Sequence, residues 1–293
     1  MVDQRKAYIY TLIVVLLWST VASAFKISLR YLDFTQVVLY AAFVSLLVFF
    51  IILVQQKKFH LIKECTARDY LRSVLLGFLN PFLYYLVLLK AYSLLPAQQA
   101  VSLNYTWAIQ LVILSIPLLR QKIGLKSIAA VFIGYVGVVI IATRGGVSGF
   151  KIFNPTGIIL ALGSAVIWAF FWIFNIKDRR DEVVKLLLNF AFGFVFIVLY
   201  SLIFARITLP SMAGVLGAGY VGLFEMGITF VLWLKALRLS RTTAQVTNLV
   251  YLTPFLALVF ISMVVGERIL LSTVIGLLLI VTGIILQKSS ARH

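Results

Sequence analysis

Several residue types that catalysis and metal binding depend on are scarce in this 293-residue chain. Cys65 is the only cysteine, which excludes an intramolecular disulfide and a cysteine metal cluster. His60 and His293 are the only histidines, and both lie outside the apolar runs. Asp and Glu together number nine, and charged residues make up 12% of the chain. Hydrolase or transferase chemistry needs carboxylates, histidines or metal ligands close to one another, so we expect neither an enzyme nor a cofactor.

The scarcity of charge is matched by an excess of apolar residues, at 62% of the chain. Soluble domains carry about 45–50% apolar and about 25% charged residues. A chain this apolar has too little polar surface to face water, so we expect lipid to be its main solvent. The net charge of +17 is compatible with nucleic-acid binding, but the basic residues lie in short gaps between apolar runs rather than in one patch. We therefore expect no nucleic-acid partner.

Apolar runs that can cross a bilayer recur along the whole chain. A spanning helix needs about 20 mostly apolar residues to cross about 30 Å of hydrocarbon. Ten runs meet this requirement, so the sequence predicts an all-α integral membrane protein of about ten transmembrane helices. The runs cover 7–28, 35–55, 70–92, 96–119, 126–143, 155–176, 183–205, 212–237, 241–264 and 269–287.

Positive charge predicts the orientation of these helices. Nineteen of the 26 Lys and Arg residues lie at the two termini or in alternate connections counted from the N-terminus. The other seven are Lys26, Arg30, Lys90, Arg144, Lys151, Arg206 and Arg268. Cytoplasmic loops carry the excess of Lys and Arg, so both termini are expected in the cytoplasm. An even number of helices is required for that, and ten satisfies it.

Short sequence matches recur at an offset close to half the chain. Leu89-Lys90-Ala91 ends the third run and Leu234-Lys235-Ala236 ends the eighth, 145 positions later. Gly137 in the fifth run corresponds to Gly283 in the tenth, 146 positions later. A near-constant offset of this kind indicates an internal repeat.

The repeat divides the chain into a half of residues 1–147 and a half of residues 148–293, with five helices in each. Five is an odd number, so the second half must cross the membrane upside down relative to the first. Inverted five-helix repeats are typical of secondary transporters, which bind substrate near the midplane between the repeats and alternate their access. A channel is the alternative, but no repeated filter sequence is present. The chain also has no nucleotide-binding loop, so the energy must come from gradients or from the substrate itself.

Residues of the second half also carry a family resemblance. Pro254 lies in the ninth run, Gly266-Glu267 follow at its end, and Gly276 and Gly283 lie in the tenth. With this pattern the chain resembles the EamA type of the drug/metabolite transporter superfamily over essentially its full length. The first half departs from it, because Ile109 stands in place of the proline and Gln121-Lys122 in place of Gly-Glu.

The resemblance implies an exporter-like carrier of the inner membrane with a central cavity lined by both halves. Similar proteins handle amino acids, other metabolites, cations or sugar conjugates, so the resemblance does not identify the substrate. Its implied partners are a small-molecule substrate and the lipid bilayer, and it leaves monomer and homodimer open.

Glu225 is the one acidic residue at the centre of a predicted span. A charge at the bilayer centre costs about 2.5–3.5 kcal/mol on insertion scales, so such a residue normally faces a cavity or a partner. One hypothesis makes it a proton site or the anchor of an amine-bearing substrate. The alternative is a structural hydrogen bond to a neighbouring helix.

Polar residues of the fourth and ninth runs are further candidates for a cavity lining. Gln99, Ser102 and Thr106 share one face of the fourth helix, and the repeat offset relates this stretch to Asn248 and Tyr251 in the ninth. The alternative is packing, in which such side chains hydrogen-bond between helices. The adjacent Asn104-Tyr105-Thr106 matches a glycosylation acceptor, but no glycan can be attached within an apolar run, so we assign it no role.

Aromatic and kinked positions complete the candidate site. Trp168 and its counterpart Trp18 lie deep in the sixth and first runs, where aromatic faces line pockets for cations; interfacial anchoring is the alternative. Asn80, before Pro81, interrupts the third helix and lies one turn from Tyr84, so both border the pathway or mark a simple kink.

Together these features predict a secondary transporter that exports or exchanges small metabolites, with amino acids or other amine-bearing solutes favoured and proton coupling through Glu225 preferred. Passive facilitation is one alternative. A carrier of sugar phosphates or nucleotide sugars is another, and it would need lysines such as Lys26, Lys90 or Lys235 to turn inward. An intramembrane enzyme is a remote alternative.

Overall fold

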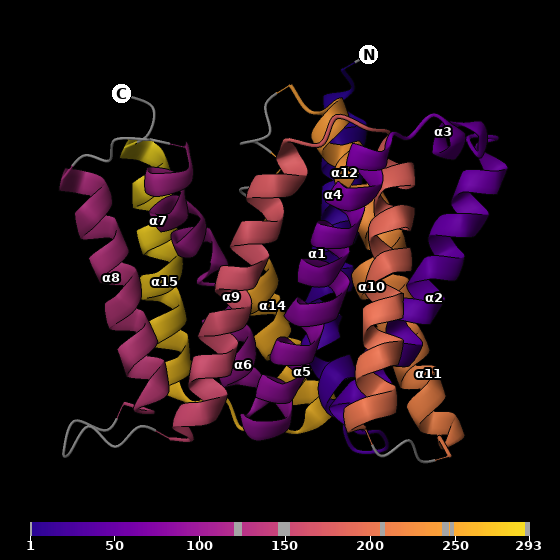
Figure 1. The fold of residues 1–293 in the computed structure, drawn as a ribbon. Helices are drawn as coiled ribbons and strands as arrows, with labels where there is room; N and C mark the ends of the chain where they lie inside the picture. The colour runs from indigo at the N-terminus through magenta and orange to yellow at the C-terminus, as the bar shows by residue number, and fades with distance from the viewer. Residues whose placement is uncertain are drawn as a thin grey trace.

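The computed structural model describes residues 2–119, 125–145, 153–205, 209–241, 246 and 249–290. Every regular element in these ranges is helical, which confirms the all-α class (Figure 1). The α-helices are α1 (Gln4–Ser28), α2 (Phe34–Gln55), α3 (His60–Lys63), α4 (Ala67–Gly77), α5 (Tyr84–Leu94), α6 (Ala97–Asn104), α7 (Trp107–Leu119), α8 (Leu125–Ala142), α9 (Pro155–Ile176), α10 (Glu182–Phe204), α11 (Met212–Val221), α12 (Ile228–Leu239), α14 (Thr253–Phe260) and α15 (Leu271–Ser290). Three π-helical segments join some of them: η1 (Phe78–Leu83), η2 (Gly222–Gly227) and η3 (Ile261–Val265).

Short polar side chains set where several helices begin. Asp33 accepts hydrogen bonds from two backbone N–H groups of the first turn of α2, and Asp181 does the same for α10. Thr66 forms a reciprocal capping box with Asp69 at the start of α4. The first N–H groups of a helix have no partner within it, so these side chains satisfy them and fix the boundary.

Six helical stretches of the described chain are long and apolar enough to cross a membrane. They are Gln4–Ser28, Phe34–Gln55, Ala67–Leu94, Pro155–Asn175, Glu182–Phe204 and Met212–Leu239. Shorter apolar helices cover Ile128–Ala142, Thr253–Val265 and Leu271–Leu286. The run expected to be one helix over 96–119 is instead two helices, because α6 ends at Asn104 and α7 begins at Trp107.

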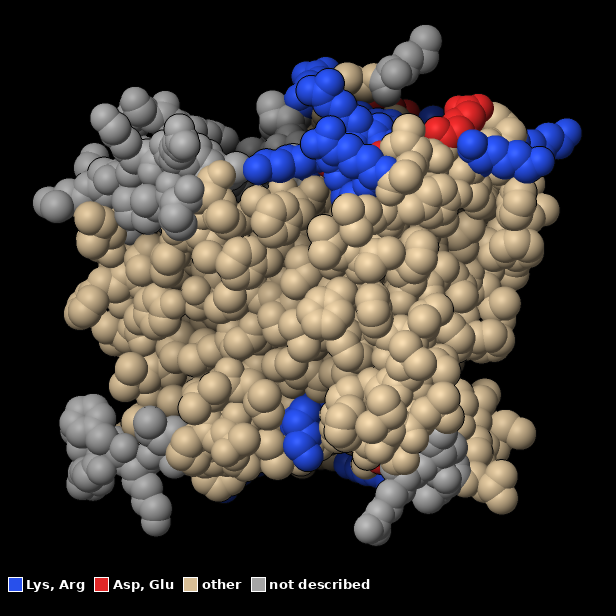
Figure 2. All heavy atoms as spheres, viewed as in Figure 1, with Lys and Arg blue, Asp and Glu red and all other residues tan. Residues whose placement is uncertain are grey.

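Charge is distributed as a membrane protein requires. Figure 2 shows a wide band of the visible face without Lys, Arg, Asp or Glu among the described residues, between two ends where charged side chains gather. Lys and Arg are concentrated at one of these ends. Helix α1 begins and α15 ends at this same end (Figure 1). A band of this kind has no hydrophilic surface for water and fits the hydrocarbon layer.

Helices from the two halves of the chain pack against each other in matching pairs. Helix α8 packs along α15, α2 packs against α10, and α6 contacts α14. Helix α1 packs against α12, and α5 packs against α9. Each contact joins one helix from before residue 147 to one from after it, so the interior of the molecule lies between the halves.

Glycines allow α8 and α15 to approach closely. A Cβ atom at Gly283 would lie 2.6 Å from the backbone oxygen of Ala130 and 3.1 Å from the nitrogen of Gly134. Gly276 and Gly137 face each other in the same way, each with the other's backbone oxygen against the position of its missing Cβ. Small residues at helix interfaces of membrane proteins permit backbone contact of this kind.

The Gly266-Glu267 pair contacts a helix of the first half of the chain, α6, at its N-terminus. Gly266 adopts a φ of +79° and ends η3, a conformation that favours glycine. This turn presents the Glu267 carboxylate to the start of α6, where it accepts hydrogen bonds from the backbone N–H of Ala97 at 2.8 Å and of Gln98 at 3.3 Å. The carboxylate thereby caps a helix of the first half, where a negative charge is stabilised by the helix dipole.

Candidate functional site

A cavity of about 540 Å³ lies between helices of both halves. Its walls come from α1, α5, α6 and α7 in the first part of the chain and from α9, η2 and α12 in the second. All five tryptophans of the chain line it: Trp18, Trp107, Trp168, Trp172 and Trp233. Membrane tryptophans are often interfacial anchors. Because these five converge on one cavity, a place in the pocket lining is favoured over interfacial anchoring for Trp18 and Trp168.

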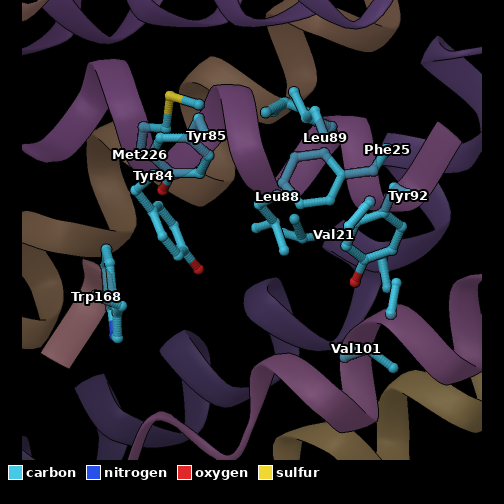
Figure 3. Packing of buried hydrophobic residues seen from close by; sticks show 14 of the residues in the cluster. Val21, Phe25, Tyr84, Tyr85, Leu88, Leu89, Tyr92, Val101, Trp168 and Met226 are labelled. Carbon is cyan, nitrogen blue, oxygen red and sulfur yellow. The ribbon is translucent and has the colours of Figure 1, made fainter. Parts of the chain in front are cut away.

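The aromatic rings of the cavity contact one another. The ring of Trp168 lies 4.5 Å from that of Tyr84, at an angle of 31°, and 5.8 Å from that of Trp172. Trp18 and Trp233 lie 5.9 Å apart. In Figure 3, Tyr84 and Tyr92 extend from α5 with their hydroxyl groups directed into the same open space, and Trp168 flanks Tyr84. The cavity therefore offers several flat π-faces together with phenol groups.

Glu225 is the charged residue of this lining. Its Oε1 atom accepts a hydrogen bond from the Tyr85 hydroxyl at 3.1 Å. Its backbone oxygen accepts one from Nε1 of Trp18 at 3.4 Å. The carboxylate is thus oriented by a tyrosine that is itself fully buried, and Glu225 is one of the lining residues. Among the described lining residues there is no Lys or Arg, so the wall holds an acidic side chain without a basic partner.

A second polar group lies beside Trp168 at the cavity wall. The Tyr84 hydroxyl donates to Oδ1 of Asn104 at 3.3 Å, and Nδ2 of Asn104 donates to the Ser164 hydroxyl at 2.9 Å. These two hydrogen bonds link α5, α6 and α9. It fixes the Asn104 amide and the Tyr84 ring at the cavity wall, where they provide hydrogen-bonding groups for a polar ligand.

The backbone is irregular beside the cavity in both halves. Glu225 lies in η2, where the Thr229 hydroxyl donates to the carbonyl oxygen of Phe224. Asn80 lies in η1 with a non-helical backbone, and it is fully buried with neither amide atom bonded within the described structure. π-Helical turns inside α-helices are frequent at functional sites because they leave backbone groups unpaired. Asn80 itself is not part of the cavity lining, whereas Tyr84 is.

The predicted polar face of the fourth run lies away from the cavity. Nε2 of Gln99 donates to the backbone oxygen of Ile141 in α8 at 2.9 Å. The hydroxyl groups of Ser102 and Thr106 donate to backbone oxygens of Gln98 and Leu103, within one turn. All three side chains are buried, and none belongs to the described lining. Only the Gln99 contact is a hydrogen bond between helices, as in the packing alternative, whereas Ser102 and Thr106 bond within their own stretch of chain.

The candidates of the ninth run are placed only in part. Tyr251 is half-buried against the hydrophobic core and is not part of the described cavity lining. Asn248 lies outside the described residues.

Sequence reasoning did not identify several residues of this site. Asn104 and Tyr105 line the cavity, although they belong to the sequon that was assigned no role. Tyr85 holds Glu225, and Trp107 and Trp233 complete the aromatic lining. An available signal was that all five tryptophans lie within the predicted apolar runs. Within the described ranges, no three His, Cys, Asp or Glu side chains gather as a metal site.

Comparison with known proteins identifies a family. The model of the EamA-like transporter family matches residues 5–143 and matches again over residues 155–287. Together the two ranges cover most of the chain.

Individual relatives agree with this match. An uncharacterized transporter of Clostridium kluyveri is 26% identical over 302 residues, covering 98% of this chain and 94% of that protein. The uncharacterized transporter YvbV of Bacillus subtilis is 26% identical over 181 residues, and the match covers 59% of this chain and 57% of that protein. A solved structure shares the fold, with a TM-score of 0.68 at 19% identity over 99% of both chains.

Proposed function

We propose that this chain, which belongs to the EamA-like transporter family, carries amine-bearing metabolites such as amino acids across a membrane through the central cavity. The family and the apolar helices support a multi-pass membrane transporter rather than an enzyme. The observation that carries the choice of substrate is the Glu225 carboxylate within a wall that holds every tryptophan of the chain.

The chemistry of this wall suits a small cation. Indole rings attract ammonium groups through their π-faces, by about 2 kcal/mol where water is excluded. Glu225 supplies a counter-charge, and no Lys or Arg opposes it among the described lining residues. Ligand pockets for small molecules have volumes of about 300–1,000 Å³, so a cavity of about 540 Å³ has room for an amino acid or an amine of similar size.

Alternating access between two inverted five-helix halves, residues 1–147 and 148–293, is part of the proposal. The family model matches twice, and the π-segments η1 and η2 begin at Phe78 and Gly222, 144 positions apart. The pairs α1–α12 and α5–α9 are the same contact with the halves exchanged. Interrupted helices at corresponding positions of two repeats border the substrate site in many secondary transporters.

The orientation belongs to the proposal as well. The end of the molecule where Lys and Arg gather also holds the start of α1 and the end of α15. By the positive-inside rule this end faces the cytoplasm, so both termini are cytoplasmic. The inner membrane of the cell is the location that the resemblance to EamA-type carriers implies.

Proton exchange at Glu225 is the proposed source of energy. A carboxylate that binds either a proton or the substrate ammonium, but not both, couples the two flows in opposite directions. Tyr85 keeps the carboxylate in one position in either state, because its hydroxyl bonds to Oε1.

Transport by vesicles containing the purified protein tests this function. A panel of labelled amino acids, amines and sugar phosphates would be offered, and we expect saturable uptake of an amine-bearing solute that an opposing pH gradient accelerates. Glu225→Gln removes the charge and keeps the shape, so it should reduce this uptake by about tenfold or more. The matched control is Glu64→Gln, which replaces an exposed carboxylate in the connection after α3.

Each outcome separates the alternatives. Uptake that saturates but ignores the pH gradient would indicate passive facilitation. Uptake of sugar phosphates alone would overturn the amine-bearing substrate, and equal activity of Glu225→Gln and the wild type would remove the carboxylate from the mechanism.

A further inference from the structure

A second hollow, separate from the central cavity, lies on the outside of the molecule between α4 and α9. It has a volume of about 450 Å³. Its walls are apolar and comprise Leu71, Leu75, Leu76, Phe78, Leu79 and Phe174. Leu71 and Leu75 are each 60% exposed, and Phe78 and Phe174 are each 41% exposed, so this hollow faces the bilayer.

Three cationic residues form the rim of this groove. Arg68 and Arg72 are one turn apart at the start of α4, and Lys177 follows α9. Helix α4 begins and α9 ends at the end of the molecule where Lys and Arg gather (Figures 1 and 2). The Lys177 ammonium lies 6.0 Å from the Phe174 ring, directly above the apolar wall.

Nearby acidic groups do not neutralise this rim. Asp178 lies 3.8 Å from Arg72, but its carboxylate is engaged by Arg180 at 2.6 Å and is fully buried. Asp69 keeps its charge in the capping box with Thr66, but Arg68, Arg72, Lys177 and Arg180 are four cations against the two carboxylates. The rim therefore keeps an excess of positive charge at the surface.

The dimensions of the groove match one leaflet of a membrane. From Arg68 to Leu79 the helix rises by about 16 Å, at about 1.5 Å per residue. Half of the hydrocarbon layer is about 15 Å thick. A molecule that fills the groove must carry a negative group at the cationic rim and an apolar chain of about this length below it.

We propose that this groove binds one anionic phospholipid, with its phosphate on the Arg68, Arg72 and Lys177 side chains and an acyl chain along the wall of α4 and α9. Basic pockets between transmembrane helices are suited to acidic headgroups, because each Lys or Arg near the surface favours an anionic lipid. A soluble phosphate would leave the apolar walls uncovered. The occupant is therefore a lipid of the leaflet at the Lys/Arg-rich end, and its site is independent of the transported substrate.

Lipid retention by the purified full-length chain tests the proposal. The protein in detergent would be mixed with equal amounts of phosphatidylglycerol and phosphatidylcholine of the same chains, and the bound lipid would be counted by native mass spectrometry. We expect one phosphatidylglycerol per chain to be retained in preference to phosphatidylcholine. The combined variant Arg68→Gln, Arg72→Gln and Lys177→Gln should reduce that retention by about tenfold.

The matched control removes the same charge from the same end, at the exposed residues Arg5, Lys63 and Arg241, each replaced by Gln. It should retain the lipid as the wild type does. Equal loss in both combined variants would overturn the groove in favour of a diffuse surface charge. A wild type without preference for phosphatidylglycerol would also overturn it.

A second variant tests binding of the acyl chain to the apolar wall without changing the charge. It therefore tests the lipid site even if the triple variant does not fold. Leu75→Trp fills the groove and should lower retention several-fold, whereas Leu199→Trp on the exposed face of α10 should not. Displacement of the lipid by glycerol phosphate alone would identify a soluble-anion site and overturn the lipid.

Discussion

The Tyr85 hydroxyl donates a hydrogen bond to the Glu225 carboxylate at 3.1 Å, although 140 positions separate the two residues. Tyr85 comes from the first half of the chain and lies behind the cavity wall, while Glu225 comes from the second half and lines the cavity. The proposed substrate anchor is therefore positioned by a residue of the opposite half.

The first prediction concerns this bond. Tyr85→Phe removes the hydroxyl and leaves the ring, so the carboxylate loses its fixed position. A hydrogen bond to a charged group contributes about 1.5–3 kcal/mol, and we expect the KM for an amine-bearing substrate to rise about tenfold. Vesicle uptake at several substrate concentrations measures it. Tyr70→Phe, which removes a hydroxyl bonded to the Ile62 backbone instead, is the control, and an equal KM change there would contradict the positioning role.

The second prediction concerns the aromatic lining. Since all five tryptophans line one cavity, binding of the transported solute should change the intrinsic fluorescence of the folded protein. Trp168→Leu removes the ring that contacts Tyr84 and should weaken binding by about tenfold, as expected for a desolvated cation–π contact. Fluorescence titration gives the affinity. Phe132→Leu, at a 70% exposed position of α8, should leave it unchanged. An unchanged affinity in Trp168→Leu would separate the ring from recognition.

The third prediction concerns the ion pair between α9 and α10. Asp178 is fully buried, and Arg180 donates to both of its oxygens. Removing one partner of a buried pair costs about 3–5 kcal/mol, because the other charge stays buried without it. Asp178→Asn should therefore lower the melting temperature in detergent at neutral pH, whereas Glu64→Gln at an exposed position should not.

The pH dependence of this effect has a definite sign. Burial alone would raise the pKa of Asp178, but the hydrogen bonds from Arg180 outweigh it and hold the pKa below the ordinary 3.8. The stabilisation is thus fully present above the unfolded-state pKa and is lost as pH falls through the lower folded-state pKa. The difference between the wild type and Asp178→Asn should shrink below about pH 4. A difference that grows on acidification would contradict this assignment.

The fourth prediction concerns the contact of α8 with α15. Gly283→Ala places a methyl group 2.6 Å from the Ala130 backbone oxygen, and a backbone atom cannot rotate away. Overpacking of this kind costs about 1–3 kcal/mol, so the variant should melt at a lower temperature. Gly163→Ala adds the same methyl where no atom lies within 4 Å, and it should match the wild type or be more stable. Equal melting of the two variants would show that the helices can separate without cost.

The sequence predicted the class of fold from local composition. Hydropathy identified the helical runs, and polar caps such as Asp33 and Thr66 lie where the predicted runs start. It did not predict the break between α6 and α7, since no Gly or Pro stands between Asn104 and Trp107. A break inside an apolar run has no signature in hydropathy.

The candidate site was predicted less completely. Glu225, Trp18, Trp168 and Tyr84 were chosen for depth and type, and they line the cavity. Gln99, chosen for its place on a polar face, instead bonds to the Ile141 backbone. A polar face on a membrane helix indicates that its side chains have hydrogen-bonding partners. The backbone of a neighbouring helix can provide these partners as well as a cavity can.

Glu225 and the five tryptophans show which properties of the site follow from the sequence and which require the tertiary structure. The sequence by itself determined that these residues lie within lipid-crossing helices, because a backbone in hydrocarbon must form helices and long apolar runs are the ones that enter it. Only the tertiary structure decided that they meet around one cavity and that Tyr85 orients the carboxylate. Lipid chains are as apolar as the side chains of most helix faces, so hydrophobicity does not decide which face turns inward. Close packing and hydrogen bonds between helices decide it, and these depend on residues far apart in the chain.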